Sequence, residues 1–344
     1  MSNKKLTIQE IWNSQVEATI KANQVKPRNY ISASDIGSSF IDRYYKMTGE
    51  TPTNPYDNRT LRIFDAGRLF EWIVGRSLAM AGVLKDRQLY TEIPENSQHL
   101  KILGYCDYVM GGIGNWNEAR GRIKKWLEEF KLDENNEILE KYALKLINGF
   151  EAEFGNKEIP LTVLEIKSVN SMAFWSHNNR DEANNFLGYD HHKYQLLTYL
   201  IGMKIEDGRI LYVSKDDLCL QELAVLRNGD IEQKFWEDVK KMTNFYRNKI
   251  VPQKEPEIIY DERKRRFDIN WKVGRSLFLT KIYNYKDQNE FQEKNKAKIN
   301  QINLALKHLR EIEKEKDEKK KSTLEKKLKA EQEIIIHYEL NKLK

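Results

Sequence analysis

Three polar residues on two strand-like segments have the types that phosphodiester hydrolysis needs. Asp107 lies late in an apolar run, and Glu165 and Lys167 lie two residues apart in another. Alternate residues of a strand share a face, so Glu165 and Lys167 should project together, about 6.6 Å apart, with Ile166 facing the core. Carboxylates bind hard cations such as Mg²⁺, which shield phosphate charge and lower the pKa of an attacking water. A neighbouring lysine can orient that water.

Two further pairs share helix faces, because residues four apart are neighbours on a helix. Gly67 and Glu71 form one pair, and Gln195 and Tyr199 form the other. Glu-x-Lys alone is a weak signal: charged residues make up 32% of the chain, and such a pair usually marks a solvated strand face. Asp107 adds weight, because a carboxylate in an apolar strand is costly to bury without a partner.

The order of these motifs resembles the RecB-like branch of the PD-(D/E)XK nucleases. The motifs are G-x-x-x-E, G-x-x-D, E-x-K and Q-x-x-x-Y, and the resemblance covers about 31–246. The branch includes the CRISPR-associated RecB-like exonucleases and many phage recombination nucleases. The resemblance implies an α/β (α+β) fold with a restriction-endonuclease-like core, a mixed central sheet flanked by helices. It also implies metal-dependent hydrolysis of DNA.

The same resemblance implies a site for one or two Mg²⁺ or Mn²⁺ ions. By the family pattern, Asp107 and Glu165 ligate metal, together with the backbone carbonyl of Ile166. Glu71 stands where the family has a histidine ligand, and it keeps a group able to bind metal. The departure at Glu71 makes it the weakest of the carried-over ligands.

The remaining family roles concern the water and the substrate. Lys167 is expected to assist the nucleophilic water, and Gln195 and Tyr199 are expected to contact the substrate and support the site. The segment 34–49, which contains Arg43, Tyr44 and Tyr45, looks like the family's N-terminal R-x-x-Y helix, and Arg43 is a candidate nucleic-acid contact. The cysteine that usually neighbours this helix is absent. The sequence therefore predicts no iron–sulphur cluster.

Further basic residues are candidate nucleic-acid contacts. Lys193 follows two histidines at the start of the Gln195 helix, and those histidines cannot chelate one ion well because adjacent helical residues point apart. A compact basic cluster lies beside Phe267 and Trp271 and consists of Arg263, Lys264, Arg265 and Arg266. Cations interleaved with aromatics suit a single-strand track. A solubilising surface run explains the cluster equally well.

Composition limits the other function classes. The chain has 344 residues, 40% of them hydrophobic, with a net charge of +6. That charge is compatible with a polyanionic partner but does not require one. No apolar stretch approaches a membrane span, and the polar N-terminus does not resemble a signal peptide, so we expect no membrane association and a cytoplasmic location, in a bacterium or phage-infected host. Two cysteines predict free thiols, and no Walker-type motif predicts ATP use.

Periodicity divides the chain into four parts. The order helix, helix, strand, strand, helix, strand, strand predicts the mixed sheet. We expect an N-terminal helix in 1–30, the nuclease core in 31–250 with a helical insertion at about 116–150, a basic and aromatic connector in 251–285, and a charged helical hairpin or coiled coil in 286–344. The strands expected in the core are 101–110, 161–168, 209–213 and 218–225.

The function that these patterns favour is a DNA nuclease, with an exonuclease in recombination, repair or phage and mobile-element DNA processing as the leading form. Two alternatives stay open. One is a non-catalytic nucleic-acid-binding protein that keeps the nuclease fold; the other is an adaptor whose C-terminal helices bind a protein partner or self-associate. DNA or RNA, single or double strand, strand polarity and oligomeric state are left open by the motifs.

Overall fold

The structure is a computed structural model that describes residues 7–21, 26–130, 136–155, 157–176, 180–181, 185–227, 229–261, 264–314 and 322–325. The chain divides into two compact units. Unit 1 comprises 1–38, 43–50 and 56–251, and unit 2 comprises 39–42, 51–55 and 252–344.

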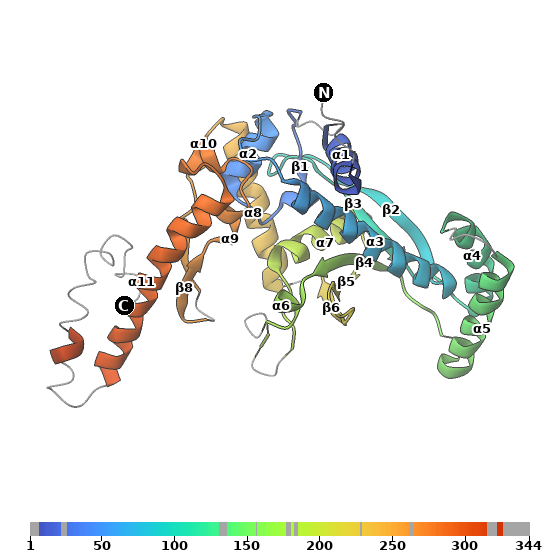
Figure 1. Cartoon of the computed structure of the whole chain (residues 1–344). Helices are drawn as coiled ribbons and strands as arrows, with labels where there is room; N and C mark the ends of the chain where they lie inside the picture. The colour runs from blue at the N-terminus through green and yellow to red at the C-terminus, as the bar shows by residue number, and fades with distance from the viewer. Residues whose placement is uncertain are drawn as a thin grey trace, which may run out of the picture. The chain divides into compact units, whose positions relative to one another are not determined.

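Unit 1 is built on a six-stranded mixed sheet (Figure 1). Its strands are β1 (Ile31–Ser32), β2 (Leu84–Ile93), β3 (Ile102–Met110), β4 (Thr162–Val169), β5 (Asp207–Ser214) and β6 (Leu220–Leu226). The order is β1-β3-β4-β5-β6, with β2 also paired to β3. The β4–β5 and β1–β3 pairs are parallel and the others are antiparallel. The predicted mixed α/β sheet flanked by helices is confirmed at this level.

Helices cover both faces of this sheet. Those of unit 1, with α2 shared between the units, are α1 (Ile8–Lys21), α2 (Phe40–Thr48), α3 (Asn58–Met80), α4 (Trp116–Glu129), α5 (Asn136–Phe154), α6 (Ser171–Phe174), α7 (Asp190–Met203) and α8 (Gly229–Arg247). Alternation along β5 separates the two faces. Val213 packs in a core cluster with α3 and α4, whereas Gly208 lies against Leu196 and Leu200 of α7.

The same alternation in β4 produces the site. Leu164 and Ile166 are buried in the cluster shared with α3 and α4. Glu165 and Lys167 therefore face the opposite side, toward α7. The parallel β4–β5 pair needs a long crossover, and the chain between the two strands supplies α7 as that crossover.

The insertion between β3 and β4 forms a helical pair. α4 and α5 pack on each other through a buried cluster that includes Trp116, Ile123, Ala143 and Ile147. Their apolar residues recur at helical spacing, which accounts for the pairing. The predicted insertion at about 116–150 thus corresponds to two helices.

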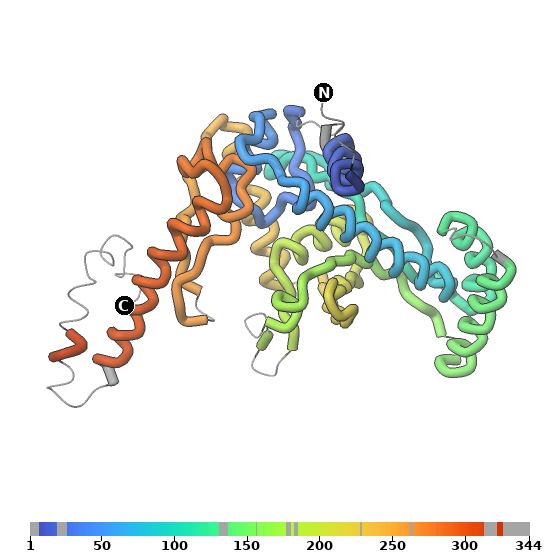
Figure 2. Tube along the Cα trace, viewed as in Figure 1, coloured from blue at the N-terminus to red at the C-terminus, as the bar shows by residue number. Residues whose placement is uncertain are grey.

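The sequence-based order of elements omitted β2, and the structure corrects this. β2 pairs with β3 along most of its length, and the two strands form the cyan hairpin of Figure 2. The middle of β2 is polar and half-exposed, so its residues lack the apolar alternation that identifies a strand. The pairing to β3, not the local pattern, makes this segment extended.

Unit 2 combines a small hairpin with a long helix. Its elements are β7 (Ile258–Asp261), β8 (Arg266–Ile269), α9 (Trp271–Gly274), α10 (Leu279–Tyr283) and α11 (Gln288–Lys314). Ile258 and Phe267 of the hairpin pack on Ile299, Ile302 and Leu306 of α11. The sequence predicted a connector here and missed the hairpin. Of the second predicted C-terminal helix, only residues 322–325 are described, and they are helical.

Two short early segments complete unit 2. The Ser39 hydroxyl donates a hydrogen bond to the Glu255 carboxylate at 2.6 Å. Asp42 accepts one from the Ser276 hydroxyl at 2.7 Å, and Asn54 donates its backbone N–H to the Leu277 carbonyl. These residues lie far apart in sequence, so unit 2 combines two short early segments with the segment 252–344.

None of the helices described here is long and apolar enough to cross a membrane.

Candidate active site

Asp107 lies where β3 and β4 part. The β3–β4 ladder runs from Met110 and Thr162 to Tyr108 and Leu164 and stops there. One residue further, Asp107 Oδ2 accepts a 2.7 Å hydrogen bond from the backbone N–H of Ile166. Asp107 is 8% exposed, so this bond supplies the partner that its burial requires.

Glu165 and Lys167 project together from β4, and α7 meets them. Lys167 Nζ donates to Glu165 Oε1 at 2.6 Å and to Gln195 Oε1 at 3.0 Å. Gln195 Nε2 in turn donates to the hydroxyl of Tyr199 at 2.9 Å. The four side chains form one continuous polar chain from β4 to α7. Burial of Glu165 and Tyr199, both 1% exposed, shelters this chain from water.

Gly104 makes room for that chain. A Cβ at this position would lie 2.7 Å from the Tyr199 ring and 2.7 Å from the Ala33 methyl group. The glycine of the G-x-x-D motif therefore allows α7 to bring Tyr199 against β3.

Glu71 reaches the same gap from α3. The pKa of its partly buried carboxyl is raised to about 7 by burial and by the neighbouring Asp107, while Lys167 and Arg68 oppose the rise. The backbone carbonyl of Glu71 accepts a 2.8 Å hydrogen bond from the Tyr108 hydroxyl. That bond ties α3 to β3 and fixes the position of Glu71 beside Asp107.

Gly75, which the sequence did not single out, permits this bond. A Cβ on Gly75 would lie 2.2 Å from the Tyr108 hydroxyl oxygen. A Cβ on Gly67, the glycine of the G-x-x-x-E motif, would meet only Ser168 Oγ at an ordinary 3.5 Å. The glycine that the packing requires is therefore four residues after Glu71, not four before it.

The carboxyl groups raise one another's pKa. Burial, and then Asp107, raises the pKa of Glu165 to about 8, against the influence of Lys167. Burial likewise raises the pKa of Asp107. Burial alone would lower the pKa of Lys167, but Glu165 and Asp107 outweigh it and raise that pKa. The site gathers more carboxyl groups than a single ammonium could neutralise if all of them were ionised, and their raised pKa values reflect this.

The carboxyl oxygens of Asp107, Glu165 and Glu71 are the kind of ligand that a hard cation prefers, and one further observation supports a cation site. Within the part of the chain that the structure describes, buried Glu165 Oε2 has no hydrogen-bond partner, so a carboxyl oxygen is left without a cation or donor. Against this, within the described residues no group of three or more His, Cys, Asp or Glu side chains is arranged to hold a metal ion. Lys167 Nζ instead takes Glu165 Oε1. The unpaired oxygen remains the feature that fits a cation, since an ion could bind there while Lys167 keeps its bond to Gln195.

Ile166 takes part in the site through its backbone N–H. The N–H of Ile166 is the donor to Asp107. This bond holds the Asp107 carboxylate against β4. The family's carbonyl ligand stays a prediction.

Gln88 is a further site residue that sequence reasoning missed. It stands opposite Asp107 in the β2–β3 ladder, between the pairs Arg87–Tyr108 and Leu89–Cys106. Its backbone has a φ of 47°, unusual for a residue other than glycine. Its side-chain hydrogen bond to Asp107 opposes the burial-driven rise in the pKa of that carboxyl. A glutamine in a weak strand pattern carries no sequence signal of this role.

Two predicted nucleic-acid contacts from the core have other partners. Arg43 is 1% exposed and donates to Asp238 through both terminal nitrogens, at 2.6 and 2.9 Å. Its guanidinium is committed to an ion pair inside unit 1, which corrects the expected surface contact. Lys193 lies on α7, two residues before Gln195, with Nζ 3.5 Å from exposed Asp190.

The basic cluster belongs to the turn of the β7–β8 hairpin in unit 2. Lys264 Nζ pairs with Asp268 at 2.7 Å and with Asp261 at 3.4 Å. Arg266 lies 3.7 Å from Asp268, and the carbonyl of Arg265 accepts from Arg310. Much of this positive charge is therefore balanced locally. Arg263 lies outside the described residues.

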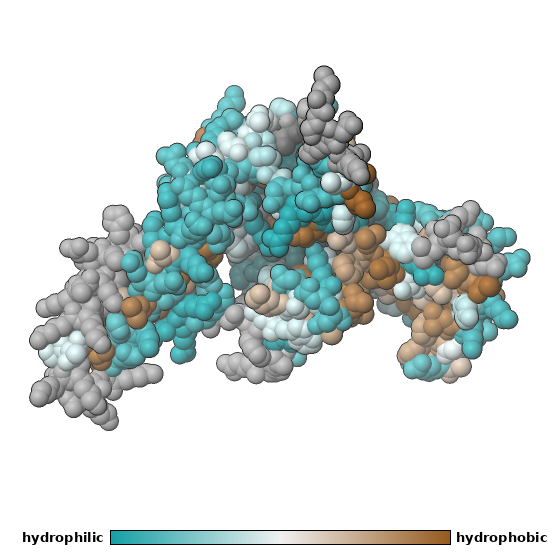
Figure 3. Space-filling model, in the orientation of Figure 1, coloured by the Kyte–Doolittle hydropathy of each residue, from teal (hydrophilic) through white to brown (hydrophobic). Residues whose placement is uncertain are grey.

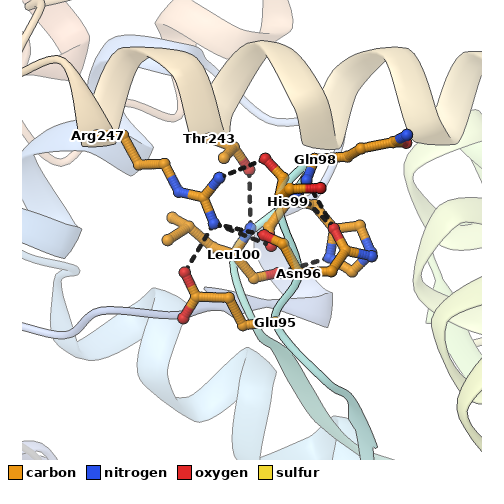
Figure 4. A network of polar contacts seen from close by, with 8 residues as sticks. Glu95, Asn96, Gln98, His99, Leu100, Thr243 and Arg247 are labelled. Carbon is orange, nitrogen blue, oxygen red and sulfur yellow. Dashed lines mark hydrogen bonds and ion pairs between the residues drawn. The ribbon is translucent and has the colours of Figure 1, made fainter.

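A second polar network lies elsewhere in unit 1 and contains none of the predicted site residues. Arg247 of α8 donates to the carbonyls of Asn96 and Ser97 and pairs with Glu95 (Figure 4). Both ring nitrogens of buried His99 are engaged, one with Asn96 and one with a backbone carbonyl. A pocket of about 550 Å³ beside His99 and Trp236 is lined by this loop and α8. The network fixes the loop before β3 on α8.

Comparison with known proteins identifies no family. No protein-family model matches the chain, and no curated protein matches it. Among solved structures, the chain described as "Crystal structure of SSO0001" is similar over 69% of this chain and 85% of that chain, with 17% sequence identity and a TM-score of 0.39. A similarity at this level does not assign a function.

Proposed function

We propose that this protein is a metal-dependent nuclease with a RecB-like PD-(D/E)XK core. The observation that carries the proposal is the meeting of Asp107, Glu165 and Lys167 at the gap between two strands. Glu71 adds a third carboxyl from helix α3. Besides burial, Asp107 raises the pKa of Glu71 and Lys167 lowers it, so the three groups lie close together. The motif order supports DNA as the substrate, and the mixed sheet is compatible with the family's core.

The residues have distinct tasks in this proposal. Glu165 and Asp107 would hold a Mg²⁺ or Mn²⁺ ion, with Glu71 as a further oxygen ligand; the bound ion would neutralise phosphate charge and acidify a water. Lys167, displaced from Glu165, orients the water and stabilises charge on the phosphate. Gln195 holds Lys167 through its amide oxygen at 3.0 Å. Tyr199, bonded to Gln195, keeps that amide from rotating.

The test is cleavage of end-labelled linear and circular DNA with Mg²⁺, Mn²⁺ or EDTA. Wild type should degrade DNA only with metal, and Glu165→Gln should reduce the rate by at least a hundredfold because it removes the ligand charge but keeps the shape. Glu206→Gln is the matched control, since Glu206 is 77% exposed and pairs only loosely with Arg227. Its rate should equal that of wild type.

The outcomes separate the alternatives. Loss of linear DNA alone indicates an exonuclease, and cutting of circles indicates an endonuclease. Equal cleavage by wild type and Glu165→Gln would refute the proposed site. DNA binding without cleavage under every metal condition would instead support a binding protein that keeps the fold.

A further inference from the structure

One face of α3 continues away from the carboxyl groups. Phe64, Arg68 and Glu71 are spaced i, i+4 and i+7, so they share that face. Arg68 lies close enough to Glu71 to lower its pKa. Gly67, on the same side, lies against Ser168 of β4. The face is thus continuous with the candidate active site.

Large side chains on this face are open to solvent. Phe64 is 48% exposed and Tyr56 is 38% exposed, and their rings meet edge to face with centroids 5.0 Å apart. In the space-filling view, hydrophobic residues gather along α3 (Figure 3). Seven residues of helix place Phe64 about 10.5 Å along the axis from Glu71. An aromatic pair is therefore exposed two turns from the carboxyl groups.

Arg68 stands between the aromatic pair and Glu71. Its side chain is 61% exposed, and its nearest acidic partner, Asp65, is 4.0 Å away at the limit of an ion pair. An exposed pair of this kind contributes little, so the guanidinium can exchange it for a phosphate, which it binds in a bidentate manner. A single strand of nucleic acid is bound by cations that contact its phosphates and by aromatic rings that stack on its bases, and this helix face carries both kinds of side chain.

We propose that this face of α3 binds a single strand of nucleic acid adjoining the reacting phosphate. Arg68 contacts a backbone phosphate, and the ring of Phe64, which Tyr56 meets edge to face, stacks on an unpaired base. A single strand fits better than a duplex, because paired and stacked bases do not offer their ring faces to a protein side chain. This inference rests on the proposed nuclease function for the position of the reacting phosphate.

The experiment measures binding without cleavage. Fluorescence anisotropy in EDTA compares a labelled single-stranded oligonucleotide with an abasic strand of equal length. Phe64→Ala should weaken binding of the normal strand roughly tenfold, since one base loses its stacking partner, and should leave binding of the abasic strand unchanged. Arg68→Ala should weaken both and lower the salt slope by about 0.7, the value for one phosphate contact.

Controls keep the result specific to this face. Tyr142→Ala removes an aromatic side chain that is 60% exposed on α5, and its binding should match wild type. Phe64→Leu keeps apolar area without a flat ring, so it should bind like Phe64→Ala, and thermal unfolding checks that both variants fold. Gel filtration of wild type and Phe64→Ala tests whether the face instead joins two copies of the chain.

Several results would overturn the inference. They are absence of binding by wild type, equal losses on normal and abasic strands with Phe64→Ala, and conversion of a dimer to a monomer by that variant. Because no metal is present, the binding pattern can hold while cleavage is never seen. That combination would refute the nuclease function and leave the strand-binding face in place.

Discussion

The buried carboxyl groups of the site give it a pH-dependent stability. The pKa of Glu165 is raised from 4.5 to about 8 by burial and by Asp107, and the pKa of Glu71 is raised to about 7 by burial and Asp107. A raised pKa means that the folded state favours the protonated form. Its stabilising contribution is complete below pH 4.5 and is lost as the pH rises through the folded value.

We therefore expect the metal-free protein to lose stability between about pH 5 and pH 8. Each pKa unit corresponds to about 1.4 kcal/mol, so the free energy of unfolding in EDTA should fall by at least about 1 kcal/mol. Urea unfolding at pH 5, 6.5 and 8 measures this. Glu165→Gln, which cannot ionise, should show a smaller fall, whereas Glu206→Gln should follow wild type. A wild type that is equally stable at pH 8 and pH 5 would contradict the assignment.

The strained backbone of Gln88 predicts opposite effects on stability and activity. Gln88→Gly relieves the positive φ, worth roughly 1 kcal/mol, and should raise the melting temperature. It also removes the hydrogen bond that orients Asp107, so the Mg²⁺ concentration for half-maximal cleavage should rise roughly tenfold, the usual effect of losing a group that orients a metal ligand.

Gln88→Ala separates the two causes. It lacks the amide but keeps the strain, so its Mg²⁺ requirement should match that of the glycine variant while its melting temperature does not rise. Unchanged metal dependence in both variants would show that Gln88 does not act through Asp107.

At the scale of elements, α3 is positioned by a glycine that the motif did not mark. Gly75→Ala forces a Cβ to within 2.2 Å of the Tyr108 hydroxyl oxygen and breaks its bond to the Glu71 carbonyl. We expect a loss of roughly 2 kcal/mol in stability, which exceeds the gain of about 1 kcal/mol from replacing glycine in a helix. Chemical denaturation measures the difference.

Gly67→Ala is the matched comparison on the same helix. Its added methyl group meets only Ser168 Oγ at 3.5 Å, so the helix propensity of alanine should appear as a gain of up to about 1 kcal/mol. Equal effects of the two substitutions would contradict the contact between α3 and Tyr108.

The sequence predicted those elements of the site whose own residues show the apolar pattern of a strand or a helix. The strands that carry Asp107 and Glu165 are apolar runs, and the Gln195 helix follows them in order. β2 could not be predicted, because its polar residues become extended only through pairing with β3. For the same reason Gln88 had no visible role: its importance depends on which residue stands opposite it.

At the scale of the whole molecule, the sequence predicted which polar side chains of the core meet better than it predicted the partners of the basic residues. Asp107, Glu165, Lys167, Gln195 and Tyr199 are brought together by hydrogen bonds within unit 1. Arg43 reads as a surface cation in sequence, but Asp238, 195 residues away, buries it. In the basic turn of unit 2, Lys264 pairs with two acidic residues of its own hairpin, Asp261 and Asp268. The residues next to a basic side chain in the sequence do not show which distant acidic residue it will pair with.

The composition of unit 2 also has a consequence for synthesis on the ribosome. Its pieces 39–42 and 51–55 are synthesised some 200 residues before the piece that begins at 252. Ser39 and Asp42 must wait for Glu255 and Ser276 to leave the exit tunnel before their hydrogen bonds can form. Unit 1 can begin to fold while these partners are still being synthesised, whereas the long-range contacts of unit 2 can form only after them.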